Sequence, residues 1–338
     1  MTKLRGVNLG GWLVLERWMT EGLFGGTGAV DEYTFMQTPG ALDKLREHQE
    51  NFIREEDFQW MRANGVNAVR IPVGYWVLDG DTPYVASVDR LDWAFRMAEK
   101  HDLQVLLCLH GAPGSQNGQD HSGRVGKAMW YRDEQYRQET LTVLKKLAER
   151  YRDSPVFWGL ELMNEPRFGV VQWKLRNFYN EAYKALSTIL TPNTRIVFHD
   201  AFTPRLMSNA VEAHPSWPVT MDIHWYHFAF PPVRRLPVSW YFAVIIPAHR
   251  RLIGRLLRRQ GVIVGEWSGV IAGQTIRRYP KDQRESLQHE HIRHQLEAYR
   301  LADGWFYWSY KTEGRGIWNF RSLVEDGVID PIQTTGLR

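Results

Sequence analysis

Short apolar runs of strand length recur along the chain and alternate with longer segments that have helical periodicity. The eight apolar runs are residues 4–9, 68–72, 105–109, 156–162, 195–199, 219–224, 262–266 and 304–308. Helices are expected at residues 54–64, 88–101, 134–151, 173–190, 204–213, 247–260 and 282–302. Strands that alternate with helices are typical of a parallel sheet covered by helices.

Eight strands with intervening helices predict an α/β fold of the closed (β/α)8 TIM-barrel type. The length of 338 residues suits one such barrel, and no repeat, linker or low-complexity tract interrupts the order. We therefore expect a single domain that spans residues 1–338. A doubly wound open sheet is the alternative, but no Gly-x-Gly-x-x-Gly turn follows any of the strands.

Two of the apolar runs end in a glutamate. Residues 160–166 read Leu-Glu-Leu-Met-Asn-Glu-Pro and place Glu165 after the fourth strand, and residues 262–267 read Val-Ile-Val-Gly-Glu-Trp and place Glu266 at the end of the seventh. A barrel gathers the carboxyl ends of its strands on one face. Cleavage of a glycosidic bond needs one carboxyl that holds a proton and one ionised carboxylate, so this pair predicts a glycosidase site.

Further polar and aromatic residues lie at the ends of other strands. They are Arg70, His110, Asn164, His224, Tyr226 and Trp308. Each of them alone has an ordinary structural explanation, such as an ion pair, a turn cap or core packing. Together they predict a carbohydrate site, because sugar hydroxyls need many hydrogen bonds and the apolar face of a sugar packs on a flat aromatic ring. The chain contains 15 tryptophans, more than a core of this size usually needs.

Other classes of function find little support in the sequence. Acidic and basic residues are interspersed and the formal charge is only +4, so no nucleic-acid partner is expected. No His-Glu-x-x-His or Cys-x-x-Cys spacing indicates a metal, and no Gly-x-Ser-x-Gly elbow indicates a serine nucleophile. No cofactor is expected either, because two carboxylates complete the hydrolysis of a glycoside by themselves.

The cellular location is predicted from the cysteine content and the first residues. The single cysteine, Cys108, lies in an apolar run, so no disulfide can form within the chain. The first strand begins almost at once, and no Asn-x-Ser/Thr acceptor is present. These features favour a cytoplasmic location, although a trimmed sequence would look the same.

The ordered set of motifs resembles glycoside hydrolase family 5, and within it the fungal exo-β-1,3-glucanases. The matching blocks are RGVNLGGWLVLE (5–16), DEYT (31–34), VRIPVGYW (69–76), LHGAPGSQNG (109–118), NEP (164–166), HDAF (199–202), GEWS (265–268) and residues 304–313. The resemblance therefore covers the whole predicted barrel.

This resemblance implies a role for each matched residue. Glu165 would be the general acid/base and Glu266 the nucleophile, while Asn164 would bind the 2-hydroxyl of the sugar. Arg70 and Tyr226 would hold Glu266 ionised and oriented. His110 and His224 would line the same subsite, Trp308 would be its stacking floor, and Glu16 would bind hydroxyls at the closed end.

We expect a depressed pKa for Glu266 beside the arginine and a raised pKa for buried Glu165. We also expect the two carboxyls to lie about 5 Å apart, which gives retention of the β configuration.

The expected activity is that of a retaining β-glucosidase or exo-β-1,3-glucanase acting on a β-glucan oligosaccharide or another β-glucoside. A β-glucosidase for a glycolipid, such as a steryl glucoside or glucosylceramide, is an alternative, as is a transglycosylase. A catalytically inactive carbohydrate-binding barrel is a further alternative from a different class.

Two departures from the resembled enzymes concern the leaving group. Those enzymes carry a phenylalanine clamp where this chain has Gln119-Asp120-His121, and Phe228 or Phe230 would supply the other half. Residues 238–259 form an apolar run followed by a basic amphipathic segment. Leu252, Ile253, Leu256 and Leu257 share one face, and Arg250, Arg251, Arg255, Arg258 and Arg259 lie largely on the other. An ordinary barrel helix with an exposed arginine face is one interpretation, and contact with a membrane or a lipid aglycone is the other.

Overall fold

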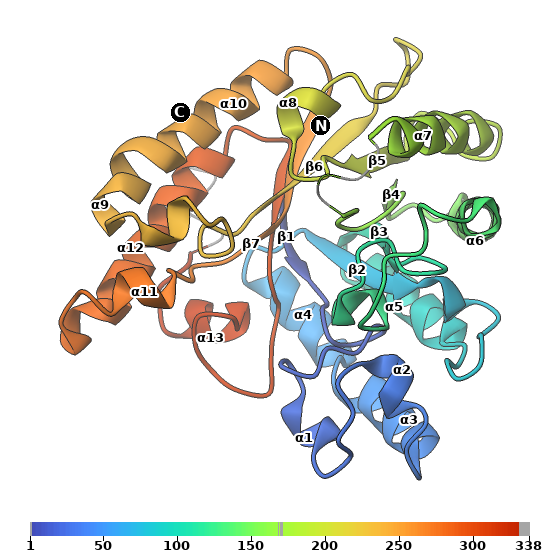
Figure 1. The fold of residues 1–338 in the computed structure, drawn as a ribbon, viewed down its shortest axis with the longest axis horizontal. Coiled ribbons are helices and arrows are strands. Elements are labelled where there is room, and N and C mark those ends of the chain that lie inside the picture. Colours follow the sequence, from blue (N-terminus) through green and yellow to red (C-terminus); the bar gives the residue numbers. More distant parts are fainter. Residues whose placement is uncertain (1, 168, 170–171, 331–338) are drawn as a thin grey trace.

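The computed structural model describes residues 2–167, 169 and 172–330, and its centre is a closed barrel of parallel strands (Figure 1). The strands are β1 (Leu4–Asn8), β2 (Ala68–Gly74), β3 (Gln104–Gly111), β4 (Phe157–Glu161), β5 (Arg195–His199), β6 (Thr220–Trp225), β7 (Gly261–Trp267) and β8 (Gly304–Tyr307). Each strand pairs with its neighbour in sequence, and β8 closes on β1. The predicted (β/α)8 barrel is confirmed.

Helices surround the barrel on its outside (Figure 1). The longer ones are α3 (Ala41–Asn51), α4 (Glu55–Ala63), α5 (Val88–Lys100), α6 (Glu134–Tyr151), α7 (Gln172–Leu186), α10 (Ile246–Leu256) and α12 (Lys281–Tyr299). The short ones are α1 (Glu21–Phe24), α2 (Glu32–Phe35), α8 (Pro204–Met207), α9 (Val238–Trp240), α11 (Gly273–Ile276) and α13 (Phe320–Glu325). The sequence pattern did not predict α3.

The barrel interior is filled near the amino-terminal halves of the strands. Its apolar cluster consists of Leu4, Ala68, Leu106, Val197, Ile263 and Phe306. The fit is close, because a Cβ added at Gly6 would lie 2.2 Å from the ring of Phe306. A second and larger apolar core lies between the outer faces of the strands and the helices. The interior is thus packed at one end, which leaves the carboxyl ends of the strands free to hold polar groups.

Two of the predicted helices differ most from the structure. The helix expected at residues 204–213 is a single turn, α8, which ends where the Ser208 hydroxyl bonds to the carbonyl of Arg205 at 3.0 Å. Such local hydrogen bonds from serine compete with continuation of a helix. The helix expected at residues 247–260 begins earlier, because α9, a π-helical turn (Tyr241–Ile245) and α10 follow one another without a break.

The π-helical turn is a consequence of Pro247 in the helical segment. Pro247 has no N–H, so the carbonyl four residues before it receives no helical hydrogen bond. A turn with wider hydrogen bonding lies just before the proline and carries the helical backbone past it. The apolar run with which residues 238–259 begin is therefore the first half of one helical segment, residues 238–256. Among the described residues, no helix is long and apolar enough to cross a membrane.

Candidate active site

A cavity of about 990 Å³ opens at the carboxyl ends of the barrel strands. Seven of the nine residues predicted to form the site line it: Glu16, His110, Glu165, His224, Tyr226, Glu266 and Trp308. The other two, Arg70 and Asn164, are fully buried behind the wall and contact the lining residues. The structure therefore brings all nine side chains together, although they come from segments up to 292 positions apart.

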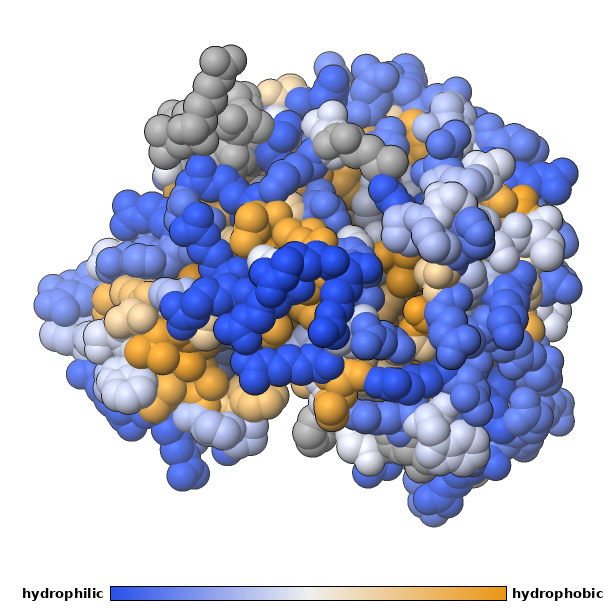
Figure 2. All heavy atoms as spheres, turned by 90° about the horizontal axis from the view of Figure 1, so that it is seen from above, coloured by the Kyte–Doolittle hydropathy of each residue, from blue (hydrophilic) through white to orange (hydrophobic). Residues whose placement is uncertain are grey.

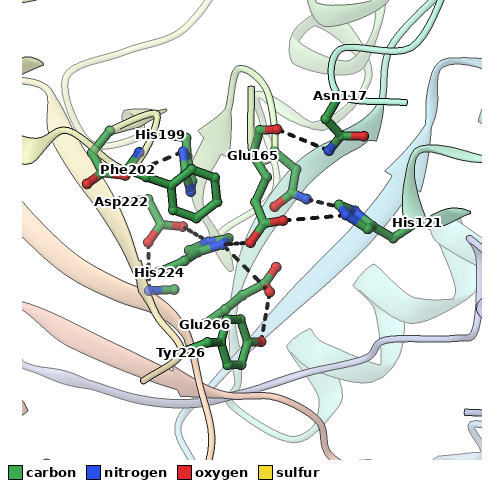
Figure 3. Close-up of polar contacts among 12 residues, drawn as sticks. Asn117, His121, Glu165, His199, Phe202, Asp222, His224, Tyr226 and Glu266 are labelled. Carbon is green, nitrogen blue, oxygen red and sulfur yellow. Dashed lines mark hydrogen bonds and ion pairs between the residues drawn. The ribbon is translucent and has the colours of Figure 1, made fainter. Parts of the chain in front are cut away.

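Both glutamates approach the same nitrogen of His224 (Figure 3). His224 Nδ1 is 2.8 Å from Glu165 Oε1 and 3.6 Å from Glu266 Oε2. These two oxygens can therefore be no farther apart than the sum of the two distances, 6.4 Å. Retaining glycosidases hold their carboxyls about 5–5.5 Å apart and inverting ones about 6.5–9.5 Å apart. The separation of these two oxygens is therefore shorter than the range found in inverting enzymes, which favours a retaining mechanism.

Glu165 is held in an unusual backbone conformation after β4. Its φ is 39°, in the left-handed region that a side chain other than glycine rarely adopts. Asn117 Nδ2 donates to its carbonyl at 3.0 Å, and His121 Nε2 lies 3.4 Å from its Oε2. The first contact from the β3–α6 loop holds the backbone of Glu165 and the second holds its side chain (Figure 3).

Arg70 connects the supporting residues beneath the cavity. Its Nε and Nη2 donate to Glu161 at 2.7 and 3.1 Å, and its Nη1 donates to Glu266 Oε1 at 2.8 Å. The same Nη1 donates to Asn8 Oδ1 at 2.9 Å, and Nη2 to Asn164 Oδ1 at 2.8 Å. A planar guanidinium can make these bonds together, which a lysine ammonium cannot.

Asn164 is oriented by its bond with Arg70. Because Oδ1 accepts from Arg70, Nδ2 points the other way and lies 3.3 Å from His110 Nε2 and 3.5 Å from His121 Nδ1. The His110 ring stacks on Trp308, with an angle of 9° between the rings. The amide, the imidazole and the indole thus form one ordered wall of the cavity.

The pKa directions of the two glutamates differ from expectation. Burial would raise the pKa of Glu165, but the hydrogen bond and charge of His224 outweigh it, so the pKa is lowered. Burial raises the pKa of Glu266 against the opposing charges of His224 and Arg70. The sequence-based expectation was a lowered pKa for Glu266 and a raised pKa for Glu165, and both directions are the opposite. The reason is that His224 bonds to Glu165 at the shorter distance, while Arg70 divides its charge between Glu266 and Glu161.

The surroundings of His224 favour its protonated form. Burial opposes that charge, but Glu266, Asp222 and Glu165 together outweigh it and raise the pKa of His224 well above its usual value. Its Nε2 lies 3.3 Å from Asp222 Oδ2. Both ring nitrogens therefore face carboxylate oxygens, which favours the protonated imidazole.

The two remaining predicted residues are Tyr226, which bonds to Glu266, and Glu16, which lies in the cavity wall. Tyr226 Oη donates to Glu266 Oε2 at 2.9 Å. Glu16 is buried and accepts a hydrogen bond from Trp18 Nε1 at 2.9 Å. Burial and the nearby charge of Asp120 raise the pKa of Glu16 well above its usual range. A protonated carboxyl at this end can both donate to and accept from a sugar hydroxyl.

Comparison with known proteins agrees with this geometry. The family model described as Cellulase (glycosyl hydrolase family 5) matches residues 36–314. The chain belongs to glycosyl hydrolase family 5.

Two relatives are named probable glucan 1,3-beta-glucosidase A. The one from Aspergillus clavatus is 34% identical, over 96% of this chain and 86% of that protein. The one from Emericella nidulans is 35% identical, over 96% of this chain and 89% of that protein. Among solved structures, the rutinosidase from Aspergillus niger superposes with a TM-score of 0.82 at 19% identity, over 97% of this chain and 98% of that one. This structural likeness shows that the two proteins share a fold.

Three charged or polar residues of this family 5 site were not predicted. Glu161 and Asp222 lie inside β4 and β6, where a carboxylate in an apolar strand was the available signal. His121 lies in the loop that departs from the resembled enzymes. Asp222 also accepts from the Gly265 N–H at 2.6 Å, and a Cβ at Gly265 would lie 1.9 Å from it, so only glycine fits there.

The sequence predicts that one half of the aromatic clamp of the resembled enzymes is replaced in this chain, and the lining of the cavity agrees. Phe228 and Phe230 both line the cavity, and Phe228 packs against Trp318 with ring centroids 5.7 Å apart. Gln119 lines the cavity at the position of the other half. Trp18 and Trp318, which pack 5.0 Å apart, also line it and were not predicted.

Two groups of described residues have the spacing of metal ligands. They are Glu165, His199 and His224, and Glu161, Asp222 and His224. Both contain His224, whose two nitrogens already lie within 3.3 Å of the carboxylates of Glu165 and Asp222. Arg70 bonds to Glu161 in the second group. A cation would have to displace these internal ion pairs, so the chemistry of the donor set fits proton transfer better than metal binding.

Proposed function

We propose that this family 5 enzyme is a retaining β-glucosidase that removes terminal β-linked glucose, with β-1,3-glucan oligosaccharides among its substrates. The observation that carries the proposal is the shared contact of Glu165 and Glu266 with His224, which limits the distance between their carboxylates. The two relatives named as glucan 1,3-beta-glucosidases support the choice of sugar and linkage.

Glu266 is the nucleophile in this proposal. Arg70 holds Oε1 and Tyr226 holds Oε2, so the carboxylate is fixed in direction before the substrate arrives. Attack on the anomeric carbon forms the bond to Glu266 while the bond to the leaving oxygen breaks. Asn164 Nδ2 donates to the neighbouring 2-hydroxyl, and Trp308 packs against the sugar face.

Glu165 supplies the proton to the leaving oxygen, with His224 as its source. The negative charge of Glu266 is the largest cause that raises the pKa of His224. As Glu266 attacks the sugar this charge is lost, so the pKa of His224 falls and its Nδ1 proton passes to Glu165, whose Oε1 is 2.8 Å away. Glu165 gives a proton to the leaving oxygen in the same step, as the bond to the anomeric carbon breaks. In the second half of the reaction Glu165 takes a proton from water, and the glucosyl bond to Glu266 is hydrolysed.

Glu16 makes the enzyme exo-acting in this proposal. It is buried in the cavity wall and accepts a hydrogen bond from Trp18, so it is placed to bind the hydroxyls of the terminal glucose where a further sugar would otherwise be attached. Only the terminal residue of a glucan then reaches Glu165 and Glu266.

The stereochemistry of the first product tests this reaction. We expect proton NMR of a laminarin oligosaccharide digest to show β-glucose first, followed by mutarotation to the α form. Initial release of α-glucose would contradict the mechanism.

A second experiment with added acceptor sugars separates hydrolysis from transglycosylation. A transglycosylase would form transfer products in proportion to the acceptor concentration, while the rate of nucleophilic attack would stay the same.

We also propose that the basic face of α10 contacts anionic membranes. Arg250, Arg251 and Arg255 are exposed on this helix and Arg258 just after it, and Trp240 and Val244 just before it are 51% and 42% exposed. Figure 2 shows the face on which α10 lies, with strongly hydrophilic side chains at its centre and apolar ones beside them. Cationic and apolar groups together favour the surface of an anionic bilayer.

Liposome flotation tests the membrane contact. We expect the protein to float with vesicles that contain phosphatidylserine and to lose most of this binding when the four arginines are changed to glutamine. Changing four exposed arginines elsewhere, Arg46, Arg62, Arg152 and Arg315, is the charge-matched control. Equal flotation of both variants, or no flotation of the wild type, would contradict the contact. The cytoplasmic location stays a prediction, which cell fractionation tests.

A further inference from the structure

The cavity extends well beyond the space that one glucose can fill. Its volume of about 990 Å³ lies at the upper end of the range of about 300–1,000 Å³ found for pockets that enclose drug-sized ligands. Its lining includes Glu16, His110 and Trp308, which are proposed to hold glucose, and a group of residues between Trp225 and Leu252. We call the space along this second group the second part of the cavity and assign it to the leaving group, because the glucose would occupy the first.

One face of the helical segment 238–256 forms a wall of this second part. Ile245, Ala248 and Leu252 line the cavity, and their spacing of three and four residues places them on the same side of a helix. Phe230 and Val233 from the loop after β6 line it as well. The wall that faces the leaving group is therefore mainly aliphatic and aromatic.

No charged residue from the stretch 225–252 lines the cavity, although the stretch is rich in arginine. Arg235, Arg250 and Arg251 are exposed to solvent instead. The two histidines that do line it, His227 and His249, are kept neutral. Burial lowers the pKa of His249 to about 3 and that of His227 well below its usual value. The Trp225 ring stacks on His249 at 3.8 Å, and His249 is nearly parallel to His227.

A second glucose would find few partners along the wall formed by residues 225–252. That wall offers few polar atoms, and the side chain of Asn117 is already used by Gln119 and Glu165. The polar lining residues Gln119 and Arg167 lie outside this wall. Burying sugar hydroxyls without partners costs free energy, whereas an apolar group gains it in proportion to the area removed from water. The imbalance favours a leaving group with few hydroxyls.

We propose that the leaving-group side of the cavity binds an uncharged apolar aglycone, either an alkyl chain or a fused-ring lipid. This inference rests on the proposed β-glucosidase function and names the preferred class of substrate for the same site. The glucose enters the polar end, and the aglycone lies between α10 and the loop after β6. Release of glucose then leaves an apolar alcohol in the second part.

The rates on three glucosides test this preference. We expect kcat/KM for octyl β-D-glucoside, and for cholesteryl β-D-glucoside in mixed micelles, to exceed that for laminaribiose by about tenfold or more, given the apolar area that each would bury. A preference for the octyl compound alone identifies an alkyl chain, and one for the cholesteryl compound alone identifies fused rings. Equal or faster cleavage of laminaribiose overturns the inference but leaves the β-glucosidase function intact. No release of glucose from any of the three contradicts the proposed function instead.

Two variants and a control locate the preference in the wall. Leu252→Gln is expected to lower the ratio of kcat/KM for the preferred apolar glucoside to that for laminaribiose about fivefold or more, by placing an amide in the apolar wall. Leu42→Gln makes the same change at an exposed position of α3 that does not line the cavity, and should leave the ratio unchanged.

Ala248→Phe tests the same wall by filling it, and thermal unfolding shows whether each variant is folded. The added ring should lower the same ratio. An unchanged ratio in a folded Leu252→Gln or Ala248→Phe protein overturns the assignment of this wall.

Discussion

The polar end and the apolar end of one cavity are built in different ways. At the polar end, Arg70 alone donates to Glu161, Glu266, Asn8 and Asn164, and each bond has a fixed direction. At the apolar end, Ile245, Ala248 and Leu252 present a helix face without directional contacts. A sugar must be held by its hydroxyls, which requires groups in set positions, whereas an apolar group needs only a shape and an area.

This difference indicates which parts of the fold can change the specificity of the enzyme. The polar end comes from barrel strands, whose positions are fixed by their neighbours on both sides. The apolar end comes from the loop after β6 and the helical segment 238–256, which can vary while the barrel stays intact. The leaving-group site can therefore change in sequence while the residues that hold the sugar stay in place.

Replacement of the two glutamates should give the largest effect. Glu266→Gln removes the nucleophile and should lower kcat/KM about 10⁴-fold or more on every substrate. Glu165→Gln should lower it about 10²–10⁴-fold on laminaribiose. Formation of the glucosyl-enzyme from a dinitrophenyl glucoside, whose leaving group needs no proton, should be much less affected by Glu165→Gln. Stopped-flow release of dinitrophenol distinguishes the two, and an equal loss in both variants would show that their roles are not divided as proposed.

Arg70→Lys should damage the polar end while the charge is kept. A lysine cannot bond to Glu161, Glu266 and Asn164 together, so we expect a loss of about 3 kcal/mol in the free energy of unfolding and about 10²-fold in kcat/KM. Urea denaturation and steady-state kinetics measure the two effects. Arg150→Lys, at a partly exposed ion pair with Asp92, is the matched control and should cost less than about 1 kcal/mol. Similar losses in the two variants would argue against a special role for the Arg70 bonds.

The proton on His224 predicts a change in pH dependence. The pKa of His224 is raised, so the wild-type enzyme should keep its catalytic proton, and its kcat/KM, at pH values above 6.5. In His224→Asn the proton must be held by Glu165 alone, so the alkaline limb of the kcat/KM profile should move to lower pH. The activity near neutral pH should fall about tenfold. An alkaline limb that stays in place would exclude His224 as the source of the proton.

His249 at the apolar end should affect stability more than the chemical step. Its pKa is about 3 in the folded protein and near 6.5 in the unfolded chain, so the unfolded state binds the proton more readily as the pH falls below 6.5. The wild type should therefore lose about 2 kcal/mol of stability through this residue between pH 7 and pH 5. His249→Phe removes this contribution, and urea denaturation at the two pH values measures it. An equal loss in wild type and variant would contradict a neutral, buried His249.

The sequence predicted the two ends of the cavity with unequal success. Strand periodicity placed Glu165, Glu266 and Arg70 because each lies at or near the end of an apolar run, and the barrel brings such positions together. Glu161 and Asp222 were missed because a carboxylate inside a strand was not distinguished from an ordinary interruption. The start of the helical segment at Val238 was missed because Pro247 looks like a helix beginning, and only the fold shows the π-helical turn that bridges it.

The directions of the pKa shifts could not have been obtained from the sequence either. They depend on whether His224 Nδ1 lies nearer to Glu165 or to Glu266, a difference of less than 1 Å that only the coordinates contain. The residues were therefore predictable as a set, but the distribution of protons among them was not.

Covalent trapping is the most direct test of the claim that Glu165 and Glu266 act on one sugar from the two sides of the bond that is cleaved. The protein is incubated with 2-deoxy-2-fluoro-β-D-glucosyl fluoride, which reacts with the nucleophile and then hydrolyses slowly. Peptide mass spectrometry should find one glucosyl group on Glu266 and none on Glu165. A label on Glu165, or rapid turnover of the reagent with no label on any residue, would contradict the account.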